Sequence, residues 1–115
     1  MKAYTDIEQS QKLVEILPKE TADFHFKYYS VLEGWCEIPH YGTVSYIKDL
    51  PCWSLAALLD ILKDDIKIEK TLFDQSNMFT YSILGDAYEY RTYEHEELID
   101  ACVEMLIKLH ELKML

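Results

Sequence analysis

The chain has 115 residues, half of them hydrophobic, and a net charge of −10 from 21 acidic and 11 basic residues. This length predicts a single domain, 1–115, with one core, and the composition excludes a disordered or low-complexity chain. Arg91 is the only arginine, so direct binding to nucleic acid or to an anionic membrane, which requires clustered basic residues, is disfavoured.

The cellular compartment is indicated by the cysteines and by the apolar runs. No apolar run reaches the roughly 18 residues of a membrane span, and the first residues, Met-Lys-Ala-Tyr-Thr-Asp-Ile-Glu, lack the apolar stretch of a signal peptide. Cys36, Cys52 and Cys102 form an odd, widely spaced set without a Cys-x-x-Cys motif. Such a set is typical of reduced thiols, so we expect a cytoplasmic protein.

The acidity is uneven along the chain. Residues 1–50 hold eight acidic and five basic residues, a net charge of −3, whereas residues 51–115 hold thirteen and six, a net charge of −7. Solubility alone explains such a surplus. The alternative is that the acidic half attracts a basic partner or imitates nucleic acid.

Residues 5–17 are predicted to form the first helix. Thr5 and Glu8 have the spacing of a capping box, and Pro18 is expected to end the helix. From residue 23 the apolar period changes to two, which predicts a strand over 23–32 that pairs with a second strand over 43–47. A helical turn beginning near Thr21 is the alternative for the start of this segment.

The second helix is predicted to begin after Ser54, a plausible N-cap residue. Trp53, just before this cap, has the position of a hydrophobic staple against Leu58. Leu55, Leu59 and Leu62 continue the apolar stripe, which ends in a polar turn at residues 63–65.

Three strands are predicted next, over 66–73, 78–84 and 87–93, the last two joined by Gly85-Asp86 as a two-residue hairpin loop. In this register Leu84 faces Ala87. One side of the hairpin then collects Ile83 with Tyr88, Tyr81 with Tyr90 and Phe79 with Thr92, and the other side collects Ser82 with Glu89 and Thr80 with Arg91. We expect the final helix to pack on the aromatic side.

The final helix is predicted over 94–115. Its apolar residues cover most of the circumference, so it is expected to form the lid of the core or part of a subunit interface. The order helix, two strands, helix, three strands, helix predicts an α+β domain with a mostly antiparallel sheet packed by two or three helices.

No chemical motif predicts a catalytic, metal or cofactor site. Cys36, His40 and Cys52 lack the spacing of a known zinc module, and cysteine is usually a small buried hydrophobe. His95 and Cys102 share a helix face, but the acidic and apolar surroundings do not favour a reactive thiolate. We therefore predict no catalytic, metal or cofactor-binding residues.

Candidate binding residues come from the aromatic side chains and the acids. The aromatic residues between Tyr28 and Trp53 exceed what one sheet face and one helix can bury, and tyrosine and tryptophan are enriched at binding hot spots. The candidate partner-binding residues are Tyr29, Trp35, Tyr41, Arg91 and Tyr93. A candidate acidic strip consists of Glu94, Glu96, Glu97, Asp100 and Glu104, although carboxylates in a first helical turn are also favoured by the helix dipole.

Three blocks of the sequence resemble a family. Pro51-Cys52-Trp53-Ser54-Leu55-Ala56-Ala57-Leu58-Leu59, Tyr88-Glu89-Tyr90-Arg91-Thr92-Tyr93 and Asp100-Ala101-Cys102-Val103-Glu104-Met105-Leu106 are similar to a pattern in short uncharacterised proteins of bacteroidete gut bacteria and of their phage-like or conjugative elements. Lys108 and His110 stand where that pattern is more apolar, which counts against an interface there. The resemblance implies a bacterial protein of mobile-element origin with an accessory role and transfers no catalytic residue.

Three hypotheses for function follow. The first is a non-enzymatic binding or accessory protein that recognises a protein partner or a second copy of itself. The second is an acidic nucleic-acid mimic that inhibits a DNA-binding protein, which predicts one continuous strip of carboxylates. The third is a small enzyme, which requires a pocket where Cys36, His40 or another histidine meets a partner at hydrogen-bond distance.

Overall fold

The computed structural model describes residues 2–62, 66–73, 78–85 and 90–115. The described residues form an α+β fold in which every strand pair is antiparallel, as predicted. The helices are α1 (Ile7–Leu13), α2 (Leu55–Leu62), α3 (Leu98–Glu111) and the 3-10 turn η1 (Lys19–Thr21). The strands are β1 (Phe24–Phe26), β2 (Tyr28–Tyr29), β3 (Gly34–Trp35), β4 (His40–Tyr41), β5 (Leu50–Cys52), β6 (Ile66–Phe73), β7 (Met78–Gly85) and β8 (Tyr90–Arg91).

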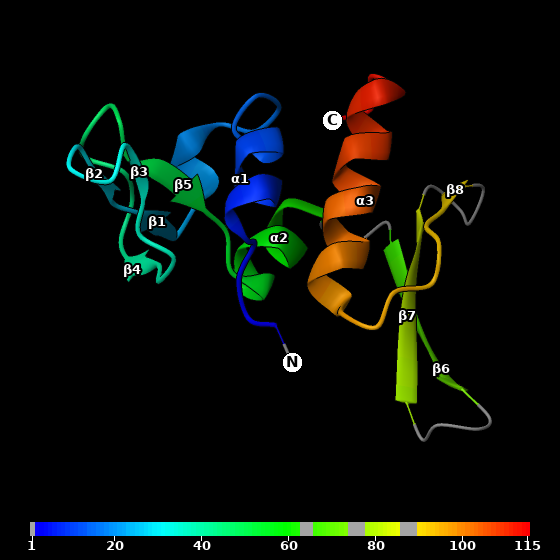
Figure 1. Ribbon diagram of the computed structural model, residues 1–115. Coiled ribbons are helices and arrows are strands. Elements are labelled where there is room, and N and C mark those ends of the chain that lie inside the picture. Colours follow the sequence, from blue (N-terminus) through cyan, green and yellow to red (C-terminus); the bar gives the residue numbers. More distant parts are fainter. Residues whose placement is uncertain (1, 63–65, 74–77, 86–89) are drawn as a thin grey trace.

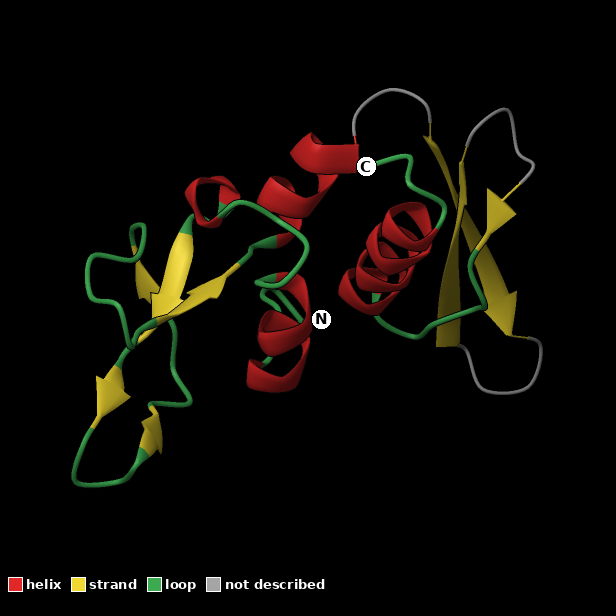
Figure 2. Ribbon diagram, turned by 90° about the horizontal axis from the view of Figure 1, so that it is seen from above, coloured by secondary structure: helices red, strands yellow, loops and turns green. Residues whose placement is uncertain are grey.

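The elements are arranged in sequence across an elongated molecule of 46 × 35 × 19 Å. Figure 1 shows the short strands β1–β5 at one end, the helices in the middle and the β6–β7–β8 sheet at the other end. Seen from above, α3 lies against one face of that sheet (Figure 2). The two groups of strands therefore contact opposite sides of a helical layer.

Helix α3 is the centre of the core. Its residues Ile99, Ala101, Cys102, Val103, Met105 and Leu106 are buried together with residues of α2, of β7 and of the segment after α1. The helix begins at Leu98, so the predicted start at residue 94 is wrong. The backbone of His95 is hydrogen-bonded to that of Tyr81 in both directions, at 2.6 and 2.8 Å, which holds this segment extended against β7.

Helix α1 begins later than predicted because Thr5 has another role. Thr5 is buried, and its hydroxyl accepts a hydrogen bond from the backbone N–H of Trp53 (3.1 Å). Asp6 is the N-cap instead, and it forms the capping box with Gln9. The helical range ends at Leu13, short of the predicted Leu17.

The predicted pairing of strands 23–32 and 43–47 is wrong. β1 pairs with His40–Tyr41 on one side and with Leu50–Cys52 on the other, and Tyr28 pairs with Trp35 across a separate two-stranded ribbon. Residues 43–47 form no strand. The edge position of β5 explains why it tolerates Pro51, which has no N–H to donate to a ladder. The alternative, a helical turn beginning near Thr21, is also wrong, because η1 ends at Thr21 and the chain is extended from Ala22 into β1.

Helix α2 confirms the predicted cap. The Ser54 hydroxyl accepts a hydrogen bond from the backbone N–H of Ala57 (3.2 Å), and Trp53 and Leu58 are both fully buried in the core. The Ser54 hydroxyl also donates to the Asp23 carboxylate, whose second oxygen accepts from the Ser54 backbone N–H. This contact fixes the start of α2 to the start of β1.

The hairpin of β7 and β8 has a different register from the predicted one. Leu84 pairs with Arg91 and Gly85 with Tyr90, so the pairing is shifted by four residues and the two-residue loop is wrong. An even shift leaves each residue on its original face. Ile83 and Tyr90 accordingly pack with the core beside α3, as expected, while Ala87, Tyr88 and Glu89 lie outside the described residues.

A truncation in α3 tests its central position. Leu106→Ala removes a fully buried side chain from the helix that contacts both α2 and β7, so we expect a loss of about 2–5 kcal/mol in the free energy of unfolding. Leu32→Ala is the matched control, because Leu32 is 71% exposed, and it should cost less than about 0.5 kcal/mol. Chemical denaturation followed by circular dichroism measures both. Equal losses would show that α3 is not the centre of the core.

Candidate functional site

An open groove lies at the end of the molecule that carries the short strands. It has a volume of about 660 Å³, within the range of about 300–1,000 Å³ typical of ligand sites. One wall is formed by His25, Lys27 and β2 with Ser30, and the other by residues 45–49. We call this concavity the β2 groove.

Hydrogen bonds hold the two walls of the β2 groove together. The backbone N–H of Tyr28 donates to Asp49 Oδ1 (2.9 Å), and Trp35 Nε1 donates to the carbonyl of Lys48 (2.8 Å). The Trp35 ring also meets the Tyr28 ring edge to face, with 6.0 Å between the centroids. The groove is therefore formed before any ligand binds, which reduces the entropic cost of binding.

The walls of the groove expose large apolar side chains. Ile47 is fully exposed, Tyr46 is 74% exposed and Tyr29 is 44% exposed. Val31 and Leu32, in the turn between β2 and β3, are 94% and 71% exposed. Exposed apolar groups gathered on one segment are typical of binding surfaces.

The charge of the groove differs from that of the chain. Lys27 and Lys48 line it, and its single carboxylate, Asp49, already accepts the hydrogen bond from Tyr28. The Lys48 ammonium lies 5.2 Å from the centre of the Tyr28 ring, in the range of a cation–π contact. In a chain with a net charge of −10, this groove is a local site that favours anionic groups.

His25 contributes a ring nitrogen with a defined role. Its Nδ1 lies 2.8 Å from the carbonyl of Gly42, which can only accept, so Nδ1 carries the proton. The ring is buried and stacks on that of His40, with 5.9 Å between the centroids. In the neutral ring Nε2 is then an acceptor.

The predicted partner-binding residues are not brought together. Tyr29 lines the groove, and Trp35 donates a hydrogen bond to the Lys48 carbonyl in one of its walls. Tyr41 is 84% exposed on β4 and contacts Phe24 edge to face. Arg91 and Tyr93 belong to β8 and the segment after it, at the opposite end of the molecule (Figure 1). Arg91 contacts Glu69 across the sheet at 3.3 Å, and Tyr93 is 83% exposed.

Several groove residues were not predicted from the sequence. Lys27, Ile47 and Lys48 are ordinary surface or strand residues by pattern, and residues 43–47 were expected to pair as a strand. The clustering of tyrosines from Tyr28 to Tyr46 was the one available signal.

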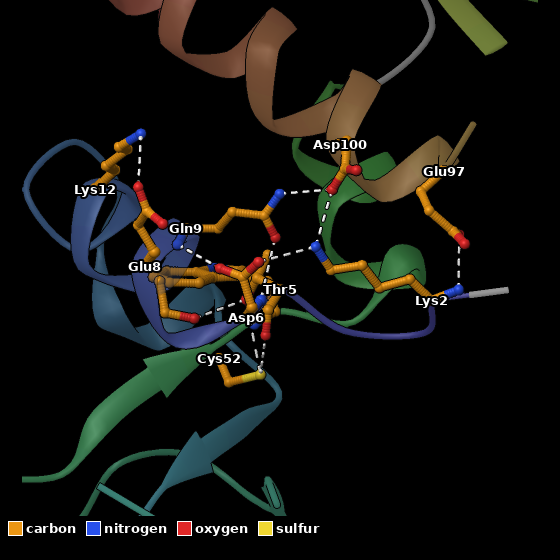
Figure 3. Close-up of polar contacts among 11 residues, drawn as sticks. Lys2, Thr5, Asp6, Glu8, Gln9, Lys12, Cys52, Glu97 and Asp100 are labelled. Atoms are coloured by element: carbon orange, nitrogen blue, oxygen red, sulfur yellow. Dashed lines mark hydrogen bonds and ion pairs between the residues drawn. The ribbon is translucent and has the colours of Figure 1, made fainter. Parts of the chain in front are cut away.

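Two carboxylates of the predicted acidic strip, Glu97 and Asp100, contact the N-terminal segment and α1. Figure 3 shows the Lys2 side chain between Asp6 and Asp100, at 3.0 and 2.9 Å, while the Gln9 amide also donates to Asp100 (2.7 Å). The backbone N–H of Lys2 donates to Glu97 (2.7 Å). These contacts join the N-terminal segment and α1 to the start of α3.

The remaining acids have separate surroundings. Glu104 accepts from the backbone N–H of Tyr93 (3.0 and 3.1 Å) and lies 2.7 Å from His95 Nε2. Glu94 lies 3.5 Å from the Thr80 hydroxyl, and Glu96 is exposed. The His95–Glu104 pair borders a shallow hollow of about 410 Å³ that also contains Lys2, Asp6 and Asp100.

The charged contacts of the N-terminal segment shift two pKa values. Burial alone would lower the pKa of Lys2, but its hydrogen bonds to Asp100 and Asp6 outweigh this and raise it. Burial alone would raise the pKa of Asp6, but the Gln9 backbone N–H and the Lys2 ammonium outweigh this and lower it.

The cysteines are free thiols. Burial raises the pKa of Cys52 to about 11 and that of Cys102 to about 12, so neither thiol is activated as a nucleophile. Cys36 is half-buried. Among the residues that the structure describes, no three His, Cys, Asp or Glu side chains are grouped to hold a metal ion.

Comparisons with models of protein families, with curated proteins and with solved structures give no match to this chain. The resemblance of residues 51–59, 88–93 and 100–106 to a bacteroidete family therefore stays a prediction. No helix in the described part of the chain has the length and apolar character needed to span a bilayer.

The Asp6 cap predicts how stability depends on pH. Because the folded-state pKa of Asp6 lies below its ordinary value of 3.8, the carboxylate stabilises the fold above that pH and loses this contribution as the pH falls through the folded-state pKa. Asp6→Asn keeps a capping side chain but removes the charge, so at pH 7 it should cost about 0.5–1 kcal/mol.

That difference should shrink toward zero in thermal melts as the pH falls through the folded-state pKa of Asp6, because the wild-type carboxyl then becomes protonated. Glu8→Gln is the control: Glu8 is 81% exposed in the same helix and lies 3.7 Å from Lys12, so this change should stay within about 0.5 kcal/mol of wild type at each pH. A loss in Asp6→Asn that does not vary with pH would contradict the role of the charge.

Thiol labelling tests the state of the cysteines. With a disulfide reagent at pH 8, we expect rapid reaction of Cys36 alone in the native protein and of all three thiols after unfolding in guanidinium. Cys36→Ser should abolish the rapid phase. Any thiol that still reacts rapidly in this variant would show that Cys52 or Cys102 is accessible and activated.

Proposed function

We propose that this protein is a non-enzymatic binding protein whose β2 groove takes an extended segment of a partner protein. The segment carries an aromatic or aliphatic side chain next to carboxylates. The supporting observation is that one preformed groove is lined both by the exposed side chains of Tyr29, Tyr46 and Ile47 and by two lysines, Lys27 and Lys48. The apolar groups provide area to bury, and the lysines select acidic neighbours.

The proposal extends to an accessory role in a reducing compartment such as the cytoplasm. The three free cysteines support that location, and the accessory role follows from the resemblance of residues 51–59, 88–93 and 100–106. Tyr41, Arg91 and Tyr93 lie outside the groove and belong to no part of this binding site.

The nucleic-acid mimic has weaker support. A mimic needs carboxylates that point to solvent at regular intervals, but Glu97, Asp100 and Glu104 accept hydrogen bonds from the chain itself. The enzyme hypothesis has the His95–Glu104 contact in its favour. Both Glu104 oxygens, however, already accept from the Tyr93 backbone N–H, which gives the carboxylate a structural role.

A peptide library tests the groove. The probe is a displayed library of random twelve-residue peptides selected on the immobilised protein, and we expect a consensus that joins an aromatic or aliphatic residue to Asp or Glu. The affinity of a selected peptide, measured by fluorescence anisotropy, should fall at least about tenfold in the double variant Lys27→Glu and Lys48→Glu, a change of about 1.4 kcal/mol.

Lys12→Glu is the matched control, because Lys12 is an exposed lysine on α1 outside the groove. It should leave the affinity within about twofold. A consensus without acidic residues, or equal affinity in the double variant, would overturn the proposal.

A further inference from the structure

Strand β6 is a long edge strand. It pairs with β7 along all of its residues, from Ile66 opposite Gly85 to Phe73 opposite Met78. Within the described residues no other strand pairs with its outer side, since the order of the sheet is β6-β7-β8. An edge of this length offers a row of backbone donors and acceptors to another chain.

The hydrogen bonds of β7 determine which residues of β6 present that row. Tyr81 and Ile83 direct their backbone groups away from β6, to His95 and Thr92. Because backbone direction alternates along a strand, Thr80, Ser82 and Leu84 direct theirs toward β6. Their partners there are Thr71, Glu69 and Lys67. The residues of β6 whose N–H and C=O groups face outward are therefore Ile66, Ile68, Lys70 and Leu72.

The side chains of β6 carry a charge pattern that restricts what can pair with it. Lys67 and Lys70 are exposed, and Glu69, between them, contacts Arg91 at 3.3 Å. Charged side chains on an edge strand disfavour pairing with any strand that lacks complementary charges. Ile68 and Leu72 are 38% and 50% exposed on the side of the sheet where α3 packs, so the strand also has apolar surface to bury.

We propose that two copies of this chain pair antiparallel along β6, with the two-fold axis at Ile68. In this register Lys67 of each copy lies opposite Glu69 of the other, and Ile68 contacts Ile68 of the second copy. Ile66 and Lys70, which both present backbone groups outward, form hydrogen-bonded pairs across the axis. The result is one continuous sheet with both α3 helices on the same face.

The charges exclude the neighbouring registers. An axis at Lys67, Glu69 or Lys70 places a like charge directly opposite itself, which is destabilising. An axis at Thr71 places Lys70 opposite Leu72 and brings no described residues of opposite charge together, whereas the axis at Ile68 brings together two Lys67–Glu69 pairs. A shift by a single residue would set outward-facing backbone groups against inward-facing ones, so no ladder would form.

This inference does not rest on the β2 groove, because β6 and β2 lie at opposite ends of the molecule (Figure 1). Its test is a complementation of charge variants. Lys67→Glu makes positions 67 and 69 both acidic, and Glu69→Lys makes both of them basic. Each variant alone sets like charges opposite one another in the proposed dimer, whereas a mixed pair restores opposite charges at both positions.

Sedimentation velocity in a reducing buffer, over a range of protein concentrations, measures the result. We expect a wild-type dimer, at least tenfold weaker self-association of each variant alone, and recovery of the dimer when the two variants are mixed in equal amounts. Recovery also shows that both variants are folded. Lys12→Glu is the control for a change in net charge and should dimerise as the wild type does.

Three outcomes would overturn the proposal. They are a wild-type monomer at concentrations up to about 1 mM, a dimer that Lys67→Glu does not weaken, and a mixture that stays monomeric while both variants keep the circular dichroism spectrum of the wild type.

Discussion

The structure depends on the burial of α3 from two sides. Leu106, Met105 and Ile99 are fully buried on a helix that contacts α2 on one flank and β7 on the other, so a single helix joins the two groups of strands. The Lys2 contacts with Asp100 and Glu97 join the N-terminal segment to the same helix. The larger of the two clusters of buried apolar residues includes this helix.

Both proposed interaction surfaces follow from the limits of that core. Phe26, Leu50 and Cys52 form a small separate cluster under the short strands, and beyond it Tyr46 and Ile47 remain uncovered. At the other end α3 covers Ile83 but leaves Ile68 and Leu72 exposed on β6. One helical layer thus leaves apolar side chains exposed at both ends of the molecule. A dimer through β6 would present two β2 grooves to a partner with repeated segments.

The sequence predicted the fold class and the faces of the hairpin but not its pairing. Period-two alternation assigns Ile83 and Tyr90 to one face in any even register, whereas the choice among even registers depends on tertiary contacts such as that of His95 with Tyr81. Asp6 replaced Thr5 as the N-cap for a similar reason, because Thr5 is hydrogen-bonded to Trp53 from a distant segment. To predict the groove, one would need the positions of Lys27 and Lys48 relative to Tyr46 in the folded chain, and no local sequence pattern contains them.

A map of the binding site by NMR tests most directly whether the β2 groove takes the partner segment. Amide resonances of the ¹⁵N-labelled protein would be followed while a library-selected acidic peptide is added. If the peptide binds in the β2 groove, the largest shifts will fall on residues 27–30 and 45–49, with none of comparable size in α3 or β8. Shifts concentrated on the amides of residues 94–104, or on those of Tyr90 and Arg91, would show that the partner binds elsewhere and would contradict the assignment of the β2 groove.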